Sequence, residues 1–317
     1  MIKYDYVRFG HSRHLIHTDD ESVVLRITSD PEEVRALLDR RLQVDPVRAT
    51  VLGTIRLALD LDEAQCWCAA TLDGSAVAVR SNQSYPVVLN GDWPVDDVDQ
   101  LATAVGSLPA LVGISGGPAT VRSVAARIPI AITRAMTMRL YRLETLNPPS
   151  HVAGRARRAD ADDTELIRKW YEAFNREAGG VIVDVRQEVE AALRWNGCWL
   201  WMDVEDAVVS LATRRPVVAG SARIGPVYTP TNQRKHGYGS AVTAAATLDI
   251  LNDGGVPVLL PISPIRQRAT STPDSATSQS RTSSKSTSPS RAVDRQEVNA
   301  TSRIGSARVE QLVSGPC

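Results

Sequence analysis

Aromatic residues, cysteines and net charge are all scarce in this chain. Aromatic side chains make up 5% of its 317 residues, and 36 basic against 36 acidic residues leave a formal net charge of +0. A neutral chain offers no overall electrostatic attraction to nucleic acids or anionic membranes. Its 43% apolar content is still enough to build packed cores. We therefore expect a folded protein without a nucleic-acid partner.

Long apolar runs are lacking as well. No stretch approaches the roughly 20 apolar residues that a membrane-crossing helix needs. The N-terminal Met-Ile-Lys-Tyr-Asp-Tyr carries an acid and has no apolar core of the signal-peptide kind. These features predict a cytoplasmic chain that does not associate with membranes.

The four cysteines are too few and too scattered for a disulfide framework: Cys66, Cys68, Cys198 and Cys317. Cys66 and Cys68 lie two residues apart in an expected strand, but no second Cys pair and no His-x3-His accompanies them, as zinc would require. Buried structural cysteines are therefore expected.

Three histidines near the N-terminus, His11, His14 and His17, would line up roughly on a helix and would then be able to bind a metal. No helical run surrounds them, and Arg13 lies between them. An irregular, solvated arm over residues 1–20 is the favoured interpretation, and no metal site is predicted.

The length favours two domains, and the first half alternates helix and strand signals. Asp73-Gly74 between two β-prone runs is a strong hairpin signal. Expected helices cover 29–42, 47–59, 95–105 and 119–127. Expected strands cover 65–72, 75–80, 85–89, 110–114 and 136–143.

A Pro-containing connection over 143–150 is the best domain boundary. Beyond it the expected strands cover 154–158, 198–202, 207–213, 217–227 and 256–260. The expected helices cover 164–176, 184–194 and 240–253; the first carries apolar residues on one face at helical spacing.

The most informative stretch is Ala222-Arg-Ile-Gly-Pro-Val-Tyr-Thr-Pro-Thr-Asn-Gln-Arg-Lys-His-Gly-Tyr-Gly-Ser240. It runs from a β-prone segment through a turn into two glycines and then into an alanine-rich helix. Free amides at a helix N-terminus, together with the helix dipole, form an anion cradle, and glycines let a phosphate approach the backbone. This order predicts a pyrophosphate-binding loop.

Two other phosphate motifs do not fit this loop. A P-loop requires Lys followed by Ser or Thr after its second glycine, and neither pair occurs here. A dinucleotide fingerprint requires a third glycine at position 242, which is Val. A second glycine cluster, 113–120, lacks Lys and has Pro118 at the expected first helical position, which favours a simple helix-entry turn.

Arg234-x-x-Gly237-x-Gly239 after a strand and before a helix resembles motif A of the GNAT superfamily of N-acetyltransferases. The order of elements over 154–260 is similar to a GNAT domain. The resemblance implies an α/β (α+β) fold of two GNAT-like domains, each a mixed, mostly antiparallel sheet flanked by helices. Residues 1–146 would form a degenerate first domain, and 151–261 the domain that binds acetyl-CoA.

The resemblance also implies that acetyl-CoA is the co-substrate. The expected contact residues are Val227, Tyr228, Thr229, Arg234, Lys235, His236, Gly237, Tyr238, Gly239 and Ser240. A backbone N–H at Val227 or a neighbour would polarise the thioester carbonyl. No catalytic base is identifiable, and Glu172, Glu177, Asp203 and Glu205 are expected to be solvated charges.

The family pattern ends abruptly after Leu260. GNAT proteins continue with a loop that commonly contains Asn and a helix bearing Tyr, whereas 270–290 here is mostly Ser and Thr. Such a composition favours disorder, so 262–317 is predicted to be a disordered tail. It is either native or the product of a shifted reading frame, and the sheet is expected to have an exposed edge.

The predicted function is transfer of an acetyl group from acetyl-CoA to the amine of a small molecule or peptide. The alternative is a non-catalytic acyl-CoA-binding pseudoenzyme or a structural protein, because the last elements of the fold are missing. A homodimer is left open, and the acceptor is not specified.

Overall fold

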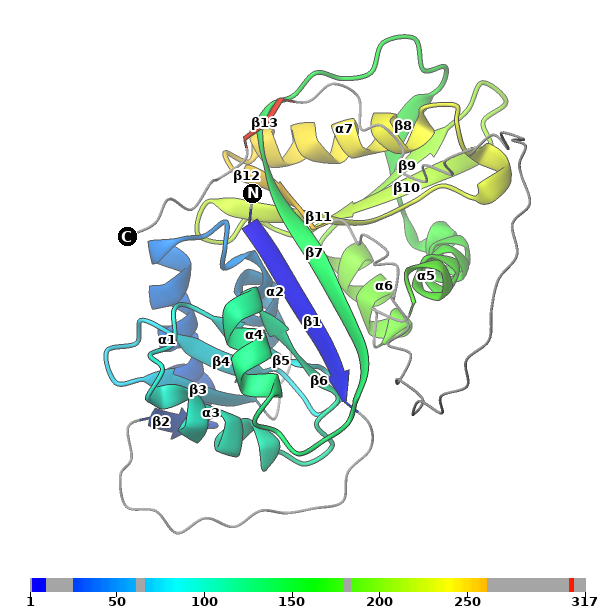
Figure 1. The fold of residues 1–317 in the computed structure, drawn as a ribbon. Helices are drawn as coiled ribbons and strands as arrows, with labels where there is room; N and C mark the ends of the chain where they lie inside the picture. Colours follow the sequence, from blue (N-terminus) through cyan, green and yellow to red (C-terminus); the bar gives the residue numbers. More distant parts are fainter. Residues whose placement is uncertain (1, 10–24, 61–65, 180–183, 261–307, 311–317) are drawn as a thin grey trace, which may run out of the picture.

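The computed structural model describes residues 2–9, 25–60, 66–179, 184–260 and 308–310. Its strands form one continuous sheet in the order β2-β3-β4-β5-β6-β1-β7-β12-β11-β10-β9-β8, with β13 pairing with β7 off this path (Figure 1). Helices cover both faces. This mixed sheet with flanking helices confirms the predicted α/β class, while the division into two domains stays a prediction.

The strands of the first half are β1 (Ile2–Phe9), β2 (Leu25–Thr28), β3 (Trp67–Thr71), β4 (Val77–Arg80), β5 (Val87–Asn90), β6 (Gly113–Gly116) and β7 (Ile132–Thr145). Its helices are α1 (Pro31–Val44), α2 (Thr50–Leu59), α3 (Asp97–Gly106) and α4 (Pro118–Ala125). Pro118 occupies the first turn of α4, as expected for a helix-entry turn.

The second half contains β8 (Arg155–Arg158), β9 (Cys198–Met202), β10 (Val208–Arg214), β11 (Ser221–Tyr228), β12 (Val256–Leu259) and β13 (Arg308–Glu310). Its α-helices are α5 (Thr164–Ala178), α6 (Val185–Arg194) and α7 (Tyr238–Asn252), with short 3-10 turns at Ala161–Asp163 and Thr231–Gln233. No described helix has the length and apolarity that a membrane crossing requires.

The first strand corrects the prediction of a solvated arm over 1–20. β1 lies in the middle of the sheet between β6 and β7 and is antiparallel to both. Val7 and Phe9 join the core on the α3/α4 face, and Tyr4 joins the core on the α1/α2 face. A strand that is covered on both faces buries the side chains of both faces. Its sequence therefore lacks the alternation of apolar and polar residues by which a half-exposed strand is predicted. The three histidines lie outside the described residues.

β7 links the two halves of the sheet. Its N-terminal part, Ile132 to Leu140, pairs with β1, and its Tyr141 and Arg142 pair with Leu259 and Val258 of β12. The prediction of an exposed sheet edge is therefore wrong at these positions of β12, because β7 from the first half of the chain pairs with them. The tail predicted to be disordered lies outside the described residues except for Arg308–Glu310, which pair with the end of β7.

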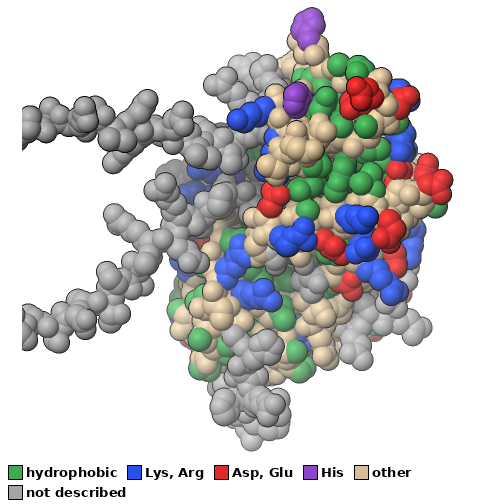
Figure 2. Space-filling model, turned by 90° about the vertical axis from the view of Figure 1, so that its right-hand side faces the viewer, with side chains coloured by type: hydrophobic (Ala, Val, Ile, Leu, Met, Phe, Trp, Pro, Cys, Tyr) green, Lys and Arg blue, Asp and Glu red, His purple; other side chains and the backbone are tan. Residues whose placement is uncertain are grey.

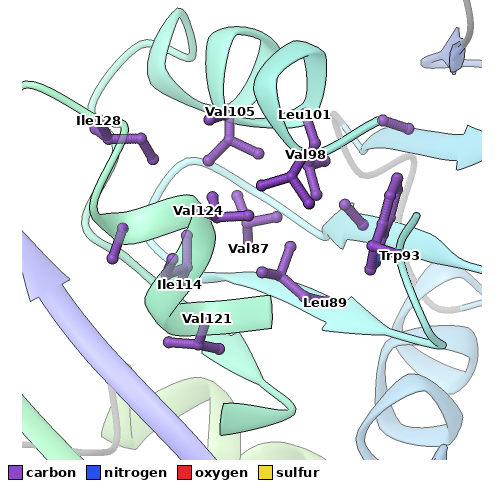
Figure 3. Close-up of a cluster of buried hydrophobic side chains, with 14 of the residues drawn as sticks. Val87, Leu89, Trp93, Val98, Leu101, Val105, Ile114, Val121, Val124 and Ile128 are labelled. Carbon is purple, nitrogen blue, oxygen red and sulfur yellow. The ribbon is translucent and has the colours of Figure 1, made fainter. Parts of the chain in front are cut away.

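Two apolar layers hold the first half together. Side chains from β5, β6, α3 and α4, including Leu89, Leu101 and Ile114, interlock on one face of the sheet, and Trp93 from the connection between β5 and α3 packs with them (Figure 3). On the other face, α1 and α2 pack over a second cluster that includes Cys66 and Cys68. The predicted burial of these cysteines is confirmed.

In the second half, α7 covers one face of the sheet and α5 and α6 cover the other. Ala222 and Ile224 of β11 pack against α7, whereas Tyr228 packs with residues of α5 and α6. β11 begins four residues later than predicted, because Ala219 (φ 49°) and Gly220 (φ 83°) form a turn that the bridge between Val218 and Ser221 closes.

Candidate functional site

The site is organised around two parallel strands that separate. β11 and β12 pair only from Ser221 with Val256 to Ile224 with Leu259. β12 then ends, while β11 continues to Tyr228, paired with β10 through Val227 and Tyr228. Over Gly225 to Tyr228, the edge of β11 that faces away from β10 has no strand partner among the described residues. This edge offers backbone N–H and C=O groups to an extended ligand.

The glycine loop leads from the end of β11 into α7. Gly237 is the N-cap of α7 with φ 83°, a left-handed conformation that glycine adopts without strain, and no side chain caps the helix. The amides of Tyr238 and Gly239 in the first turn have no acceptor within the helix by its geometry. Together with the dipole of a 15-residue helix, they form a site suited to an anion.

Every predicted site residue lies on this segment. Val227, Tyr228 and Thr229 are at the end of β11, and Arg234, Lys235 and His236 are exposed on the loop. The ring of His236 stacks on that of Tyr238 at 5.4 Å. Gly239 and Ser240 are in the first turn of α7. The structure thus gathers these residues at one end of the splayed strand, while their role in binding stays a prediction.

A hydroxyl pair fixes the end of the strand to its neighbour. Ser210 Oγ of β10 donates to the carbonyl oxygen of Tyr228 at 3.0 Å and lies 2.8 Å from Thr229 Oγ1. A Cβ placed on Gly239 would lie 3.1 Å from the same Thr229 Oγ1. The first turn of α7 therefore approaches the strand so closely that only glycine fits without displacement. Sequence reasoning had not singled out Ser210.

Glu177 is a member of the site that the sequence did not predict. Its carboxylate accepts a hydrogen bond from Tyr228 Oη at 3.2 Å and from Arg234 Nη2 at 2.6 Å. It lies in the last turn of α5, 51 residues before Tyr228 in the chain. The Glu177 side chain is 47% exposed, as expected for a solvated charge, but its pairing with Tyr228 and Arg234 is not predicted, since no local pattern reveals so distant a contact.

The Glu177 contacts also set the electrostatics of the loop. Arg234 Nε donates to the carbonyl oxygen of Thr229 at 2.9 Å, and its guanidinium lies 6.0 Å from the centre of the Tyr228 ring. Burial, and then the neighbouring Glu177 carboxylate, raise the pKa of Tyr228. Tyr228 therefore stays a neutral phenol that donates to Glu177 at physiological pH.

The other acidic residues considered from sequence have structural partners. Asp203 accepts hydrogen bonds from the amides of Glu205 and Ala207, both at 2.9 Å, and so closes the β9–β10 hairpin. Glu172 pairs with Arg168 one turn earlier on α5. Within the described part of the chain, no group of three His, Cys, Asp or Glu side chains is arranged to hold a metal ion.

Comparison with known proteins found no matching family model and no matching curated protein. Solved structures do resemble the chain. A Drosophila protein has a TM-score of 0.51 at 12% identity, covering 76% of this chain and 90% of its own. A GNAT-family acetyltransferase from Colwellia psychrerythraea has a TM-score of 0.47 at 10% identity, covering 75% of this chain and 90% of its own.

A shorter match covers about a third of the chain. A GNAT-family acetyltransferase from Brucella melitensis, in complex with acetyl-CoA, covers 33% of this chain and 73% of its own at 20% identity, with a TM-score of 0.27. Several other similar structures are also described as GNAT-family acetyltransferases. Identities this low bear on the fold alone.

Proposed function

We propose that this protein transfers an acetyl group from acetyl-CoA to an amine. The observation that carries the proposal is the splay of β11 from β12 directly before a glycine turn at an uncapped helix N-terminus. These two features suit the two ends of an acyl-CoA molecule, since an extended arm needs an open strand edge and a pyrophosphate needs backbone amides.

The order of the features along β11 sets the direction of the bound molecule. The pyrophosphate would lie against Gly237 to Ser240 at the far end of β11, and Arg234 would add positive charge there. The pantetheine arm would run back along Gly225 to Thr229, so the thioester would lie near the apex, where the pairing with β12 ends at Ile224. A backbone N–H of this edge, at Val227 or a neighbour, would polarise the carbonyl.

The reaction requires a neutral amine. Its nitrogen attacks the thioester carbonyl carbon, the carbon–sulfur bond breaks, the nitrogen loses a proton and the departing thiolate gains one. An amide edge that is fixed in place before the reaction stabilises the negative charge that develops on the carbonyl oxygen. We further propose that the halves before and after residues 146–151 are two GNAT-like domains, of which only the second has the glycine loop.

The proposal is tested by release of free CoA thiol from acetyl-CoA with a panel of small amines and amine-bearing peptides. Burial raises the pKa of both Cys68 and Cys198 to about 12, so these thiols contribute no background in the native state. Thiol release that depends on an amine supports the proposal. Binding of CoA without turnover on any amine selects the non-catalytic alternative, and no CoA binding overturns both.

Replacing Arg234 by Ala is expected to weaken CoA binding by about 1–2 kcal/mol, because one charge-assisted contact is lost while the helix amides remain. Isothermal titration calorimetry measures the change. Arg186→Ala is a matched control, since Arg186 is an exposed arginine in an ion pair on α6. Unchanged affinity in Arg234→Ala would show that Glu177 keeps Arg234 engaged even when CoA is bound.

A further inference from the structure

A small cavity lies between the two halves of the molecule, close to the apex of the splayed strands. Thr54 and Leu57 of α2 form one side of it, and Arg215, Ser221 and Arg223 from β11 and the segment preceding it form the other. It has room for about one water molecule or an atom group of that size. The cavity thus joins an element of the first half to the strand that carries the proposed acyl-CoA site.

Two of the side chains that line this cavity have buried polar atoms without a partner. Arg215 is 4% exposed. Its Nη2 donates to Glu188, but its Nε and Nη1 have no hydrogen-bond partner. Thr54 Oγ1 is also buried without a hydrogen-bond partner. A buried donor left unpaired has lost its hydrogen bonds to water without gaining others, and the loss of stability is larger when the donor is charged. Native proteins rarely retain such groups unless a ligand or water satisfies them.

The charge around the cavity favours an anion over water. Arg215 and Arg223 are two cations facing one described carboxylate, that of Glu188. Burial, and then Arg215, lower the pKa of Arg223 to about 10, as expected for a cation that lacks a counterion. The other described titratable groups that interact with these two arginines are Tyr4, Tyr85 and Tyr171, whose pKa values burial raises. These phenols stay neutral, so among the residues that the structure describes one positive charge is unbalanced.

The position of Arg223 connects the cavity to the reaction. Ala222 and Ile224, the residues on either side of it, pack against α7, so the side chain of Arg223 points to the opposite face of the sheet. Arg223 pairs with Val258, one residue before the last β11–β12 pair. It therefore lies beside the apex where the thioester would end, on the face away from α7.

We propose that Arg223, Arg215 and Thr54 form a binding site for a carboxylate, and that this carboxylate belongs to the amine that accepts the acetyl group. The second part rests on the proposed function. The acceptor would then be an amino acid or a related compound in which an amine and a carboxylate are separated by a few bonds. One carboxylate oxygen would occupy the cavity, and the amine would extend toward the apex.

The first experiment tests the carboxylate site without any acyl transfer. Thermal unfolding of the full chain is followed at constant ionic strength with increasing acetate, and with acetamide, which has the same shape but no charge. We expect acetate to raise Tm and acetamide to leave it unchanged. In Arg223→Met the acetate dissociation constant should increase at least about tenfold. Arg186→Met, at an exposed position on α6, should respond like the wild type.

Equal responses to acetate and acetamide, or an unchanged acetate response in a folded Arg223→Met variant, would overturn the carboxylate site. If Arg223→Met does not fold, Thr54→Val provides a second variant that removes only a donor, and its acetate affinity should fall severalfold. This experiment does not measure CoA binding, so its result tests the carboxylate site independently of the proposed function.

The second experiment assigns the carboxylate to the acceptor. Thiol release is compared for pairs of amines that differ only in a free carboxylate against its methyl ester. We expect kcat/KM to favour the free carboxylate by at least about tenfold, and this preference to disappear in Arg223→Met. Acetate binding without any preference for carboxylated amines would mean that the cavity takes a free anion, and would overturn the acceptor assignment.

Discussion

Replacing Gly239 by Val should abolish measurable binding of CoA. A Cβ at this position would lie 3.1 Å from Thr229 Oγ1, and its two methyl groups would extend into the space in front of the first turn of α7. The phosphate oxygens would then be unable to reach the amides. We expect a loss of at least about 3 kcal/mol in binding free energy, or more than roughly a hundredfold in Kd, measured by calorimetry.

The choice of control decides what this experiment shows. Gly117 is the N-cap glycine of α4, and a Cβ there meets nothing within 4 Å, so Gly117→Val places the same change at another helix N-terminus. It should leave CoA affinity intact. Gly237→Val should also lose binding, but Gly237 has φ 83° and its Cβ would lie 2.9 Å from Val152, so strain contributes to that loss. Normal affinity in a folded Gly239→Val variant would remove the loop assignment.

Truncation of Glu188 to Ala is expected to destabilise the fold by about 3–5 kcal/mol, because it leaves the Arg215 guanidinium buried without its carboxylate. The side chains of Arg215 and Glu188 are only 5% and 20% exposed, so water screens the pair weakly. The free energy of unfolding is measured by urea denaturation at neutral pH without acetate, since an anion bound at Arg215 would mask part of the effect.

A double substitution separates charge from packing at this pair. In Glu188→Ala combined with Arg215→Met the ion pair is removed as a whole and only the Arg223 charge remains, so the excess of one positive charge is the same as in the wild type and most of the lost stability should return. Arg186→Met combined with Glu190→Ala, at an exposed ion pair on the same helix, should cost less than about 1 kcal/mol. A single Glu188→Ala variant as stable as the wild type would show that Arg215 finds another partner or water.

One face of the molecule agrees with the neutral composition. Basic and acidic side chains lie next to one another on the face seen in Figure 2, around an apolar area. On this face no single sign of charge dominates. Recognition of an acceptor would therefore depend on individual groups such as Arg223 rather than on a field spread over the surface.

The sequence by itself determined the local structure. The Asp160 carboxylate accepts from the amide of Asp162 in a capping box before α5, Asp184 caps α6, and Gly237 and Gly239 lead into α7. These features are set by hydrogen bonds between residues a few positions apart and by the conformational freedom of glycine, so a local pattern reveals them. The sequence predicts the position of the glycine loop for the same reason.

Only the tertiary structure decided which distant segments meet. β1 pairs with residues more than 100 positions away, such as Asp5 with Gly116 and with Thr137, and β7 covers the edge that β12 would otherwise leave open. The Glu177–Arg234 pair and the cavity between α2 and Arg223 arise in the same way. Such contacts depend on which surfaces bury each other when the whole chain folds, and the free energy of burial depends on area rather than on any pattern along the chain.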